Sequence, residues 1–504
     1  MSIVRHAATI LVIIALFCPG IMAGGYENSG IGTQARGMGG AFRAVVDDWT
    51  AAYYNPAGYA FIYDNQLGAN SAFLHLRNEL IPSYRLDGIY ETGVFNDQVN
   101  VNKHEIYSNP AGGFLVRLPI YGETVMGLSA FQPFDYNIAW KLYDLPLAYN
   151  DSLTLPEDQF VNNFDVVAFQ LTLARELVED KVSFGLGIQV LRADLIFNSV
   201  AFRDNPWEDD SPLNVRPFDL ITEWNTNDGN GWGFGLKGGL LFNLNEKLNL
   251  GVTANLPFDI TLSGSSRLEY YMPKITSLLV PGSESGEEIL PGTTEYLFAA
   301  GGKIVDTADF ECDLKLPFSV GAGLAYQVND KLTVAFDAEY TFWSKYEGLD
   351  FVFTNHRGLT GAADTSDIAK EFFIAELPFG DTVLSHHAYP VEWQDAGKVM
   401  MGIRYKFNDR LTLLGGGAVD QSPAREATEI TPQFVDTGTK YSINGGVLFH
   451  HGQWDFGLAG SYTDYPDQTV PDLVDSNEDG LFDSFAGVYS AATYETVLSF
   501  QYRF

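Results

Sequence analysis

The chain has few cysteines, few basic residues and, beyond its first residues, no long apolar run. Two of its 504 residues are Cys, and 64 Asp and Glu outnumber 30 Lys and Arg, which gives a formal net charge of −34. Such an acidic excess argues against nucleic acid as a partner. The motifs CxxC, HExxH and GxSxG are also absent, so no common enzyme signature indicates catalysis, and we expect neither an enzyme nor a resident cofactor.

The first 23 residues have the layout of a secretory signal peptide. Arg5 and His6 precede an apolar run over residues 7–17, and Ala23 offers a small residue at the cleavage site. This run is too short to span a membrane as a helix. Removal of residues 1–23 leaves Cys312 as the single cysteine, which excludes an intramolecular disulfide in the mature chain.

The end of the chain alternates strictly between apolar and polar residues. Tyr494, Leu498 and Phe504 fall on one face of an extended strand, whereas Glu495 and Gln501 fall on the other. With 46% hydrophobic and 14% aromatic residues and a mean hydropathy near zero, this pattern is typical of a barrel strand with one face toward lipid and one toward water. A half-buried strand of a soluble protein is the alternative interpretation.

Short and long connections alternate over residues 66–504. Asx-rich and Gly-rich turns are expected near residues 121–123, 179–181, 245–247, 329–331, 408–410 and 451–453. Long polar loops are expected near residues 78–105, 134–161, 195–229, 265–313, 347–390, 421–438 and 466–488. This asymmetry predicts an all-β, transmembrane antiparallel β-barrel of about 14 strands, with short turns in the periplasm and long loops outside. A soluble sandwich or propeller would not need such asymmetric loops.

Residues 24–65 do not alternate and are rich in Gly and Ala. A short amphipathic helix is expected over residues 41–54, ending before Pro56 because proline disfavours helix at the residue that precedes it. A compact segment of small residues ahead of a barrel can pack inside the lumen as a plug, or hatch. A periplasmic extension is the alternative interpretation.

Several stretches of the chain resemble the FadL/TodX/OmpP1 family of outer-membrane transporters. The mature start, with Gly39-Gly40-Ala41 and the NPA motif Asn55-Pro56-Ala57, is similar to the family's N-terminal plug. Residues 231–239 with their GWG opening, the strand that begins at residue 248, and residues 393–423 are similar to later parts of the family. The resemblance covers the whole mature chain and is weakest in the middle loops.

The resemblance implies passive transport of long-chain fatty acids or aromatic hydrocarbons through a plugged barrel. Members of the family bind an apolar molecule near the outer loops, and a shift of the plug opens a path that often leads sideways into the membrane. The expected partners are therefore a hydrophobic small molecule and the lipid and lipopolysaccharide of a Gram-negative-type outer membrane, and we expect a monomer. A barrel for protein secretion or cell-surface attachment is the alternative function. A lipid hydrolase would need a Ser–His pair, and none is evident.

The candidate site residues fall into two groups. Asn55, Pro56, Ala57, Gly39 and Gly40 are the plug and gating candidates. The candidate cations for a ligand carboxylate are Arg36, Arg43, Arg404 and Lys406, although ion pairing with Asp337 and Glu339 on a water-facing strand is the preferred interpretation for these cations.

Two departures from the family argue against a fatty carboxylate as the ligand. Thr253-Ala254-Asn255 replaces a Tyr-Arg-Ser cluster of the family, and residues 437–440 replace an acidic–Arg pair. Without these groups the family's usual cationic partner for a carboxylate is missing.

A metal site is the last candidate. Asp475, Asn477, Asp479 and Asp483, with Gly480 among them, resemble the oxygen spacing of a Ca²⁺ loop but lack its closing Glu. An acidic Asx-turn loop without an ion is the alternative. His386-His387 and His450-His451 are interpreted as surface histidines rather than as metal ligands.

Overall fold

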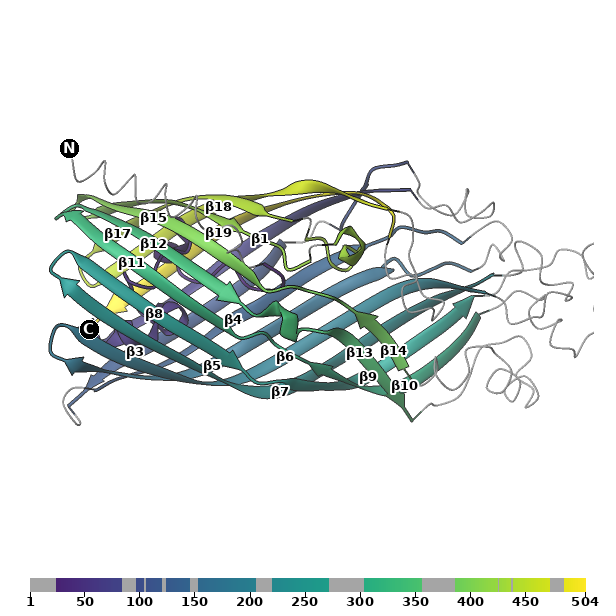
Figure 1. The fold of residues 1–504 in the computed structure, drawn as a ribbon, viewed down its shortest axis with the longest axis horizontal. Coiled ribbons are helices and arrows are strands. Elements are labelled where there is room, and N and C mark those ends of the chain that lie inside the picture. Colours follow the sequence, from purple (N-terminus) through teal and green to yellow (C-terminus); the bar gives the residue numbers. More distant parts are fainter. Residues whose placement is uncertain are drawn as a thin grey trace, which may run out of the picture.

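The computed structural model describes residues 24–83, 97–103, 106–119, 124–145, 153–204, 220–271, 303–355, 386–424, 426–436, 438–471 and 485–504. Within these residues, a single antiparallel sheet closes on itself where β1 (Gln66–Pro82) pairs with β19 (Gly487–Arg503). The result is a long barrel whose strands run obliquely to its axis (Figure 1). The expected closed β-barrel is confirmed.

Nineteen strand segments make up this sheet. Between β1 and β19 lie β2 (Asn100–Val101), β3 (Ile106–Leu118), β4 (Thr124–Trp140), β5 (Phe160–Val178), β6 (Val182–Asp204), β7 (Leu220–Asn245), β8 (Leu248–Pro257), β9 (Ile260–Tyr271), β10 (Lys303–Leu314), β11 (Ser319–Asn329), β12 (Leu332–Thr341), β13 (Gly348–Thr354), β14 (His386–Pro390), β15 (Ala396–Asn408), β16 (Leu411–Asp420), β17 (Lys440–His451) and β18 (Trp454–Val470). In five cases, two successive segments lie end to end and form one strand of the wall, because both pair with the same neighbouring wall strand. These are β2/β3, β8/β9, β10/β11, β12/β13 and β14/β15. The wall therefore has the predicted 14 strands.

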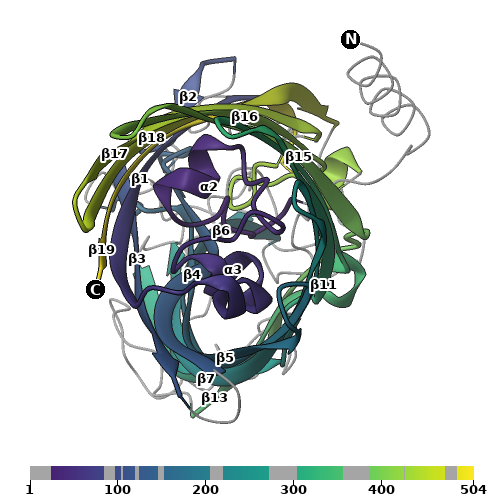
Figure 2. The same ribbon diagram turned by 90° about the vertical axis from the view of Figure 1, so that its left-hand side faces the viewer.

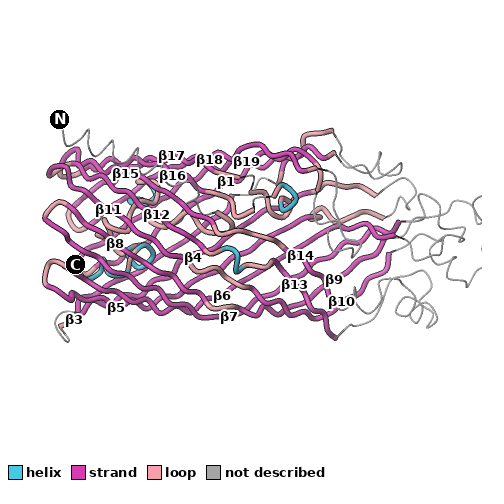
Figure 3. Tube along the Cα trace, viewed as in Figure 1, coloured by secondary structure: helices cyan, strands magenta, loops and turns pink. Residues whose placement is uncertain are grey.

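The short turns gather at one end of the barrel, on the left of Figures 1 and 3. In three of them an Asn side chain makes the turn: Oδ1 of Asn245, Asn329 or Asn408 accepts the backbone N–H two residues later. Such Asx turns reverse the chain in two residues, as the sequence indicates. The expected turn at residues 121–123 lies outside the described residues.

The alternation of β19 is as predicted. Tyr494, Leu498 and Phe504 are exposed, whereas Glu495 and Gln501 are buried toward the lumen. Leu, Ile, Phe, Trp and Tyr side chains are exposed in the same way on most of the other strands. An apolar outside and a polar inside are what a wall between lipid and a wet lumen requires.

The strands at the other end are longer than the sequence indicates. Residues 195–204 and 220–229 were expected in a loop, but they extend β6 and β7, which pair from Val182–Phe242 to Asp204–Leu220. The loop prediction was wrong because the inner face here is polar: Glu223, Asn225 and Asn227 are buried. Alternating polar residues then resemble a loop when only hydrophobicity is considered.

Residues 24–65, called here the N-terminal segment, lie inside the barrel (Figure 2). The segment contains helix α2 (Thr33–Gly37), helix α3 (Ala51–Tyr54) and the 3-10 helix η1 (Pro56–Phe61). The helix predicted over residues 41–54 was wrong, because only its last turn forms. Val46 has a φ of 26°, outside the right-handed helical range, so a continuous helix cannot pass through it.

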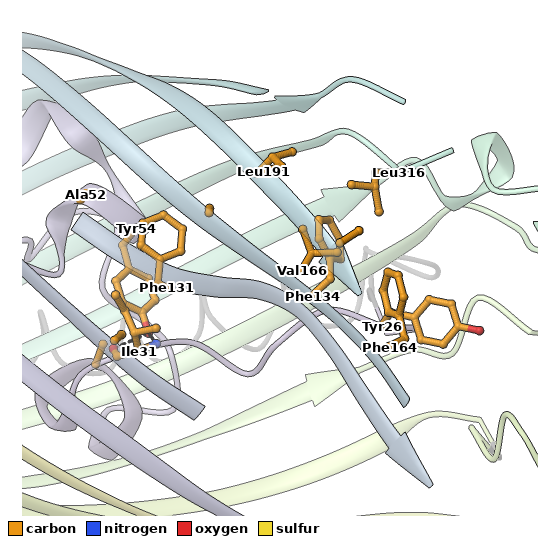
Figure 4. Close-up of a cluster of buried hydrophobic side chains, with 14 of the residues drawn as sticks. Tyr26, Ile31, Ala52, Tyr54, Phe131, Phe134, Phe164, Val166, Leu191 and Leu316 are labelled. Carbon is orange, nitrogen blue, oxygen red and sulfur yellow. Dashed lines mark hydrogen bonds between the residues drawn. The ribbon is translucent and has the colours of Figure 1, made fainter. Parts of the chain in front are cut away.

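The core lies between this segment and the wall. Ile31, Ala52 and Tyr54 of the segment face Phe131 of β4, and Tyr26 faces Phe164 of β5 (Figure 4). Among the described residues, none of the helices has the length and apolar character needed to cross a membrane. The only other short helices described are 3-10 turns, η2 (Trp343–Lys345) and η3 (Ala427–Glu429).

Candidate functional site

The NPA motif forms a tight turn that fastens the N-terminal segment to the wall. Asn55 is fully buried, and its side-chain oxygen accepts the N–H of Ala57 at 3.1 Å. Its amide donates to the carbonyl oxygens of Arg43 at 3.0 Å and of Leu240 in β7 at 3.1 Å. One side chain therefore connects two parts of the segment and the barrel.

Glycines in the wall strands leave room for this turn, because they have no side chains. A Cβ atom at Gly185 would collide with the backbone of Pro56, at Gly239 with the Asn55 side chain, and at Gly251 with the backbone of Arg43. Backbone thus packs directly on backbone. Ser183 adds a hydrogen bond to the Ala57 carbonyl at 2.8 Å.

Gly39 and Gly40 form a second close contact with the wall. Both have positive φ, 66° and 86°, a conformation that favours glycine. A Cβ at Gly39 would lie 2.9 Å from the carbonyl oxygen of Gly417 in β16, and one at Gly40 would lie 3.0 Å from the sulfur of Met400 in β15. The two glycines therefore allow the segment to turn against the barrel wall.

Arg43 makes the central ion pair of the lumen. Its guanidinium pairs with Glu339, and it lies 3.6 Å from Asp337, the partners that the sequence analysis preferred. Asp337 also accepts the N–H groups of Phe42 and Arg43 at 2.9 and 2.8 Å. Burial alone would lower the pKa of Arg43, but the charges of Glu339 and Asp337 outweigh it and raise that pKa.

The other candidate cations are held differently. Arg36 of α2 pairs with Glu495 of β19, and both side chains are buried. Arg404 of β15 pairs with Asp47 of the N-terminal segment. Lys406 is exposed near the short-turn end. The sequence did not indicate that Glu495 and Asp47 are partners, because they lie more than 350 positions from their arginines.

Tyr26 is surrounded by six aromatic rings, a feature that the sequence analysis missed. Its ring centroid lies 4.9–6.2 Å from those of Tyr136, Phe164, Trp343, Tyr346, Trp393 and Phe434. These rings come from distant parts of the chain, and Figure 4 shows Tyr26 beside Phe164. Edge-to-face packing of this kind stabilises the start of the segment by more than its buried area alone.

Residues 26–28 lie along an irregularity in β4. The pairing of β4 with β5 shifts register between Phe131 and Phe134, at Gln132 and Pro133. Asn28 donates its N–H to the Pro133 carbonyl at 3.0 Å, and Asp135 donates its N–H to the Tyr26 carbonyl at 2.9 Å. The first residues of the segment therefore cover the inner side of this kink.

Three of the cavities that border the segment bear on the site. The outer cavity, of about 110 Å³, touches Arg36 and Gly39, and the turn-side cavity, of about 1010 Å³, touches Thr33 and Gln34. Helix α2 is therefore the partition between them. A kink cavity of about 50 Å³ lies between residues 27–29 and the β4 irregularity and shares Glu27 and Lys398 with the outer cavity.

Glu27 sits where the outer and kink cavities meet. Its side chain accepts a hydrogen bond from the Thr341 hydroxyl at 2.7 Å. Burial, followed by the charge of Glu339, raises the pKa of Glu27 to about 8. A neutral carboxyl at this junction is therefore expected at physiological pH.

The metal prediction is untested. Asp475, Asn477, Asp479 and Asp483 lie outside the described residues. Among the residues that are described, no group of three His, Cys, Asp or Glu side chains is arranged to hold a metal ion.

The interpretation of His386-His387 as surface histidines was wrong for His387. This residue is buried, and its Nδ1 lies 3.1 Å from the Asn225 amide. The buried polar face of the extended β7 supplies its partner. His450 of the other pair is partly buried, with its Nδ1 2.6 Å from Asp455.

The chain matches a known protein family over most of its length. The profile of a family described as outer membrane protein transport protein (OMPP1/FadL/TodX) matches residues 16–445. The chain belongs to this family.

The relatives are distant in sequence. Outer membrane protein P1 of Haemophilus influenzae is 21% identical over 78% of this chain and 79% of its own length. The 47 kDa outer membrane protein of Pasteurella multocida is 22% identical, but the match spans only 44% of this chain and 41% of that protein.

Solved structures match nearly the whole fold. A FadL homologue of Pseudomonas aeruginosa has a TM-score of 0.67 at 16% identity, covering 95% of this chain and 99% of that one. The toluene transporter TodX of Pseudomonas putida has a TM-score of 0.60 at 15% identity, with coverages of 95% and 99%. The FadL-family barrel described here is thus an outer-membrane protein of a transport family.

Proposed function

We propose that this FadL-family barrel passes apolar small molecules, aromatic hydrocarbons or long-chain fatty acids, across the outer membrane without an energy source. Lipopolysaccharide resists apolar solutes, and a protein passage lowers that barrier. TodX is named a toluene transporter, which supports this substrate class by analogy of fold.

The observation that carries the proposal is the position of α2. This five-residue helix is the partition between the outer cavity and the turn-side cavity, and it carries no strand pairing to the wall. A short helix held by side chains can move at lower cost than any wall strand, because a strand is hydrogen-bonded on both sides. Displacement of the N-terminal segment would then join the cavities.

A sideways exit is the second part of the proposal. Residues 26–28 cover the irregularity at Gln132 and Pro133, where β4 does not pair regularly with β5. If these residues withdraw, the kink cavity would open toward the wall at Pro133. An apolar molecule that leaves there enters lipid and avoids the periplasmic water.

The test is a reversible cross-link between α2 and the wall. A Cβ at Gly37 would lie 2.8 Å from the Cβ of Leu414 in β16, so the pair Gly37→Cys/Leu414→Cys should form a disulfide after a small shift. We expect uptake of labelled toluene or labelled oleate, in cells without another transporter of this family, to fall sharply on oxidation and to return on reduction.

The matched control joins two wall strands instead. Phe169 of β5 and Val190 of β6 are register partners with side chains exposed on the outside of the barrel, so Phe169→Cys/Val190→Cys cross-links the wall on the face opposite the lumen, where α2 lies. This variant should transport at the unmodified rate in both redox states. Normal uptake by the fully oxidised Gly37→Cys/Leu414→Cys protein would refute a moving α2. Absence of uptake of both compounds by the unmodified protein would favour the secretion or attachment alternative.

A further inference from the structure

The outer cavity has an unusual balance of charge for a passage that accepts apolar molecules. Its lining includes three cations and five carboxyl groups, namely Arg36, Lys398, Lys440, Glu27, Asp135, Asp420, Asp436 and Glu495. The question is which of these groups remain available to a ligand.

Each cation is already engaged by a carboxylate. Arg36 is held by Glu495 through two nitrogens, and its third nitrogen donates to the Ser29 carbonyl. Lys440 donates to Asp436 at 3.0 Å. The Lys398 ammonium lies 3.5 Å from Asp420. A ligand carboxylate would have to displace one of these partners before it gained a cation.

Acceptor oxygens, in contrast, are left over. Asp135 lines the cavity without an ion-pair partner among the described residues. The Oδ1 atoms of Asp420 and Asp436 have no hydrogen-bond partner among the same residues. Asp436 is the clearest case of an oxygen available to a ligand. Its side chain is only 3% exposed, and a buried carboxylate oxygen without a donor is costly.

The rest of the lining can hold an apolar body. Leu74 and Leu76 of β1 line the cavity with Tyr136 and Tyr465, and the Lys440 ammonium lies 5.5 Å from the Tyr465 ring centre. A small ring or chain end can therefore lie against these residues while its polar end faces the free oxygens. A metal ion does not fit equally well, because no described group of three ligands is arranged to bind one.

We propose that the outer cavity selects apolar molecules that carry a hydrogen-bond-donating head, an amine or a hydroxyl, over molecules that carry a carboxylate. This inference rests on the transport function proposed above and names its substrate class. The two departures from the family's sequence, at residues 253–255 and 437–440, agree with this preference. Thr253 receives a hydrogen bond from Arg43 at 3.2 Å, and Lys440 is occupied by Asp436, so neither position offers a free cation to an anionic ligand.

The test compares four molecules of nearly equal size: benzylamine, benzyl alcohol, toluene and benzoate. Each is equilibrated by dialysis with the detergent-solubilised full-length protein, and binding to detergent alone is subtracted. We expect benzylamine and benzyl alcohol to bind more tightly than toluene, and benzylamine to exceed benzoate by about tenfold or more, which corresponds to about 1.4 kcal/mol.

A single substitution tests whether this preference arises in the outer cavity. Asp135→Asn removes a carboxylate that has no cationic partner among the described residues, so it leaves no buried cation behind. We expect it to reduce the ratio of benzylamine to benzoate affinity several-fold. The matched control, Asp409→Asn in the short turn after β15, should leave the ratio unchanged, because Asp409 lies outside the outer cavity.

The outcomes separate this inference from the proposed function. Tightest binding of toluene or benzoate by the unmodified protein would overturn the donor-head preference and leave apolar transport intact. An equal loss of preference in Asp409→Asn and Asp135→Asn would show that overall charge, not the cavity, sets it, and would also overturn the inference. Binding of none of the four molecules would count against both proposals.

Discussion

The barrel wall and the N-terminal segment are held in place by different means. Each wall strand is hydrogen-bonded through its backbone to two neighbours, and most neighbours are consecutive in sequence. Among the described residues, the segment's backbone is bonded to the wall at two places: Glu27 forms a bridge with Phe134, and the Asn65 carbonyl accepts the N–H of Phe504. Its other anchors are mainly side chains such as Asn55, Arg36 and Asp337.

This difference has a consequence for motion. Backbone pairing in a closed barrel must break along a whole strand before that strand can move, and in lipid each broken pair is costly. The segment can be released by the loss of a few side-chain contacts. The molecule thus combines a wall of uniform stability with an internal element whose stability depends on a few residues.

The strongest test of this contrast is Asp337→Ala. The change removes both backbone hydrogen bonds to Phe42 and Arg43 and leaves the Arg43 cation with Glu339 alone. Breaking a buried pair of this kind typically costs about 3–5 kcal/mol. We expect amide hydrogen exchange to accelerate over residues 31–62 while the wall strands stay protected.

An exposed ion pair of the wall supplies the control for that experiment. Arg192 and Asp194 pair on the outside of β6, with side chains 40% and 47% exposed, and such pairs contribute little. Arg192→Ala should change exchange in neither region. Equal acceleration in the wall and the segment of Asp337→Ala would show that the two regions are not separate units.

A smaller effect is expected from Asn55→Ala. The variant removes the acceptor for the Ala57 N–H and two donors, while the wall glycines Gly185 and Gly239 stay in place. A buried group left without its partner costs about 1–3 kcal/mol. Exchange should therefore accelerate around η1 more than around α2. Asn55→Asp keeps the acceptor for Ala57 but would place a buried carboxylate against the carbonyl oxygens of Arg43 and Leu240, so it should not restore protection around η1.

The same contrast explains which features the sequence predicts. The alternation of Tyr494 and Glu495 in β19 and the Asx turns at Asn329 and Asn408 depend on residues close in sequence. They were predicted correctly because strand and turn geometry is local. The extension of β7 was missed because buried polar residues such as Asn225 resemble a loop.

The candidate site was only partly predictable. The pairing of Arg43 with Asp337 and Glu339 was anticipated from charges that face a wet lumen. The pairing of Arg36 with Glu495 and the ring cluster around Tyr26 were not. Closure of a barrel brings together residues hundreds of positions apart, and no local spacing encodes which of them meet.

The smallest expected effect comes from a single methyl group at Gly39. In Gly39→Ala, the positive φ of 66° and a Cβ only 2.9 Å from the Gly417 carbonyl oxygen would both oppose the folded position of the segment. Strain in such a conformation costs about 1–3 kcal/mol, so exchange should accelerate modestly around α2. The control is Gly415→Ala in β16, where an added Cβ meets no atom within 4 Å. If the two alanine variants behave alike, close backbone packing at Gly39 does not hold the segment, and its other contacts, such as those of Asn55 and Arg43, must hold it.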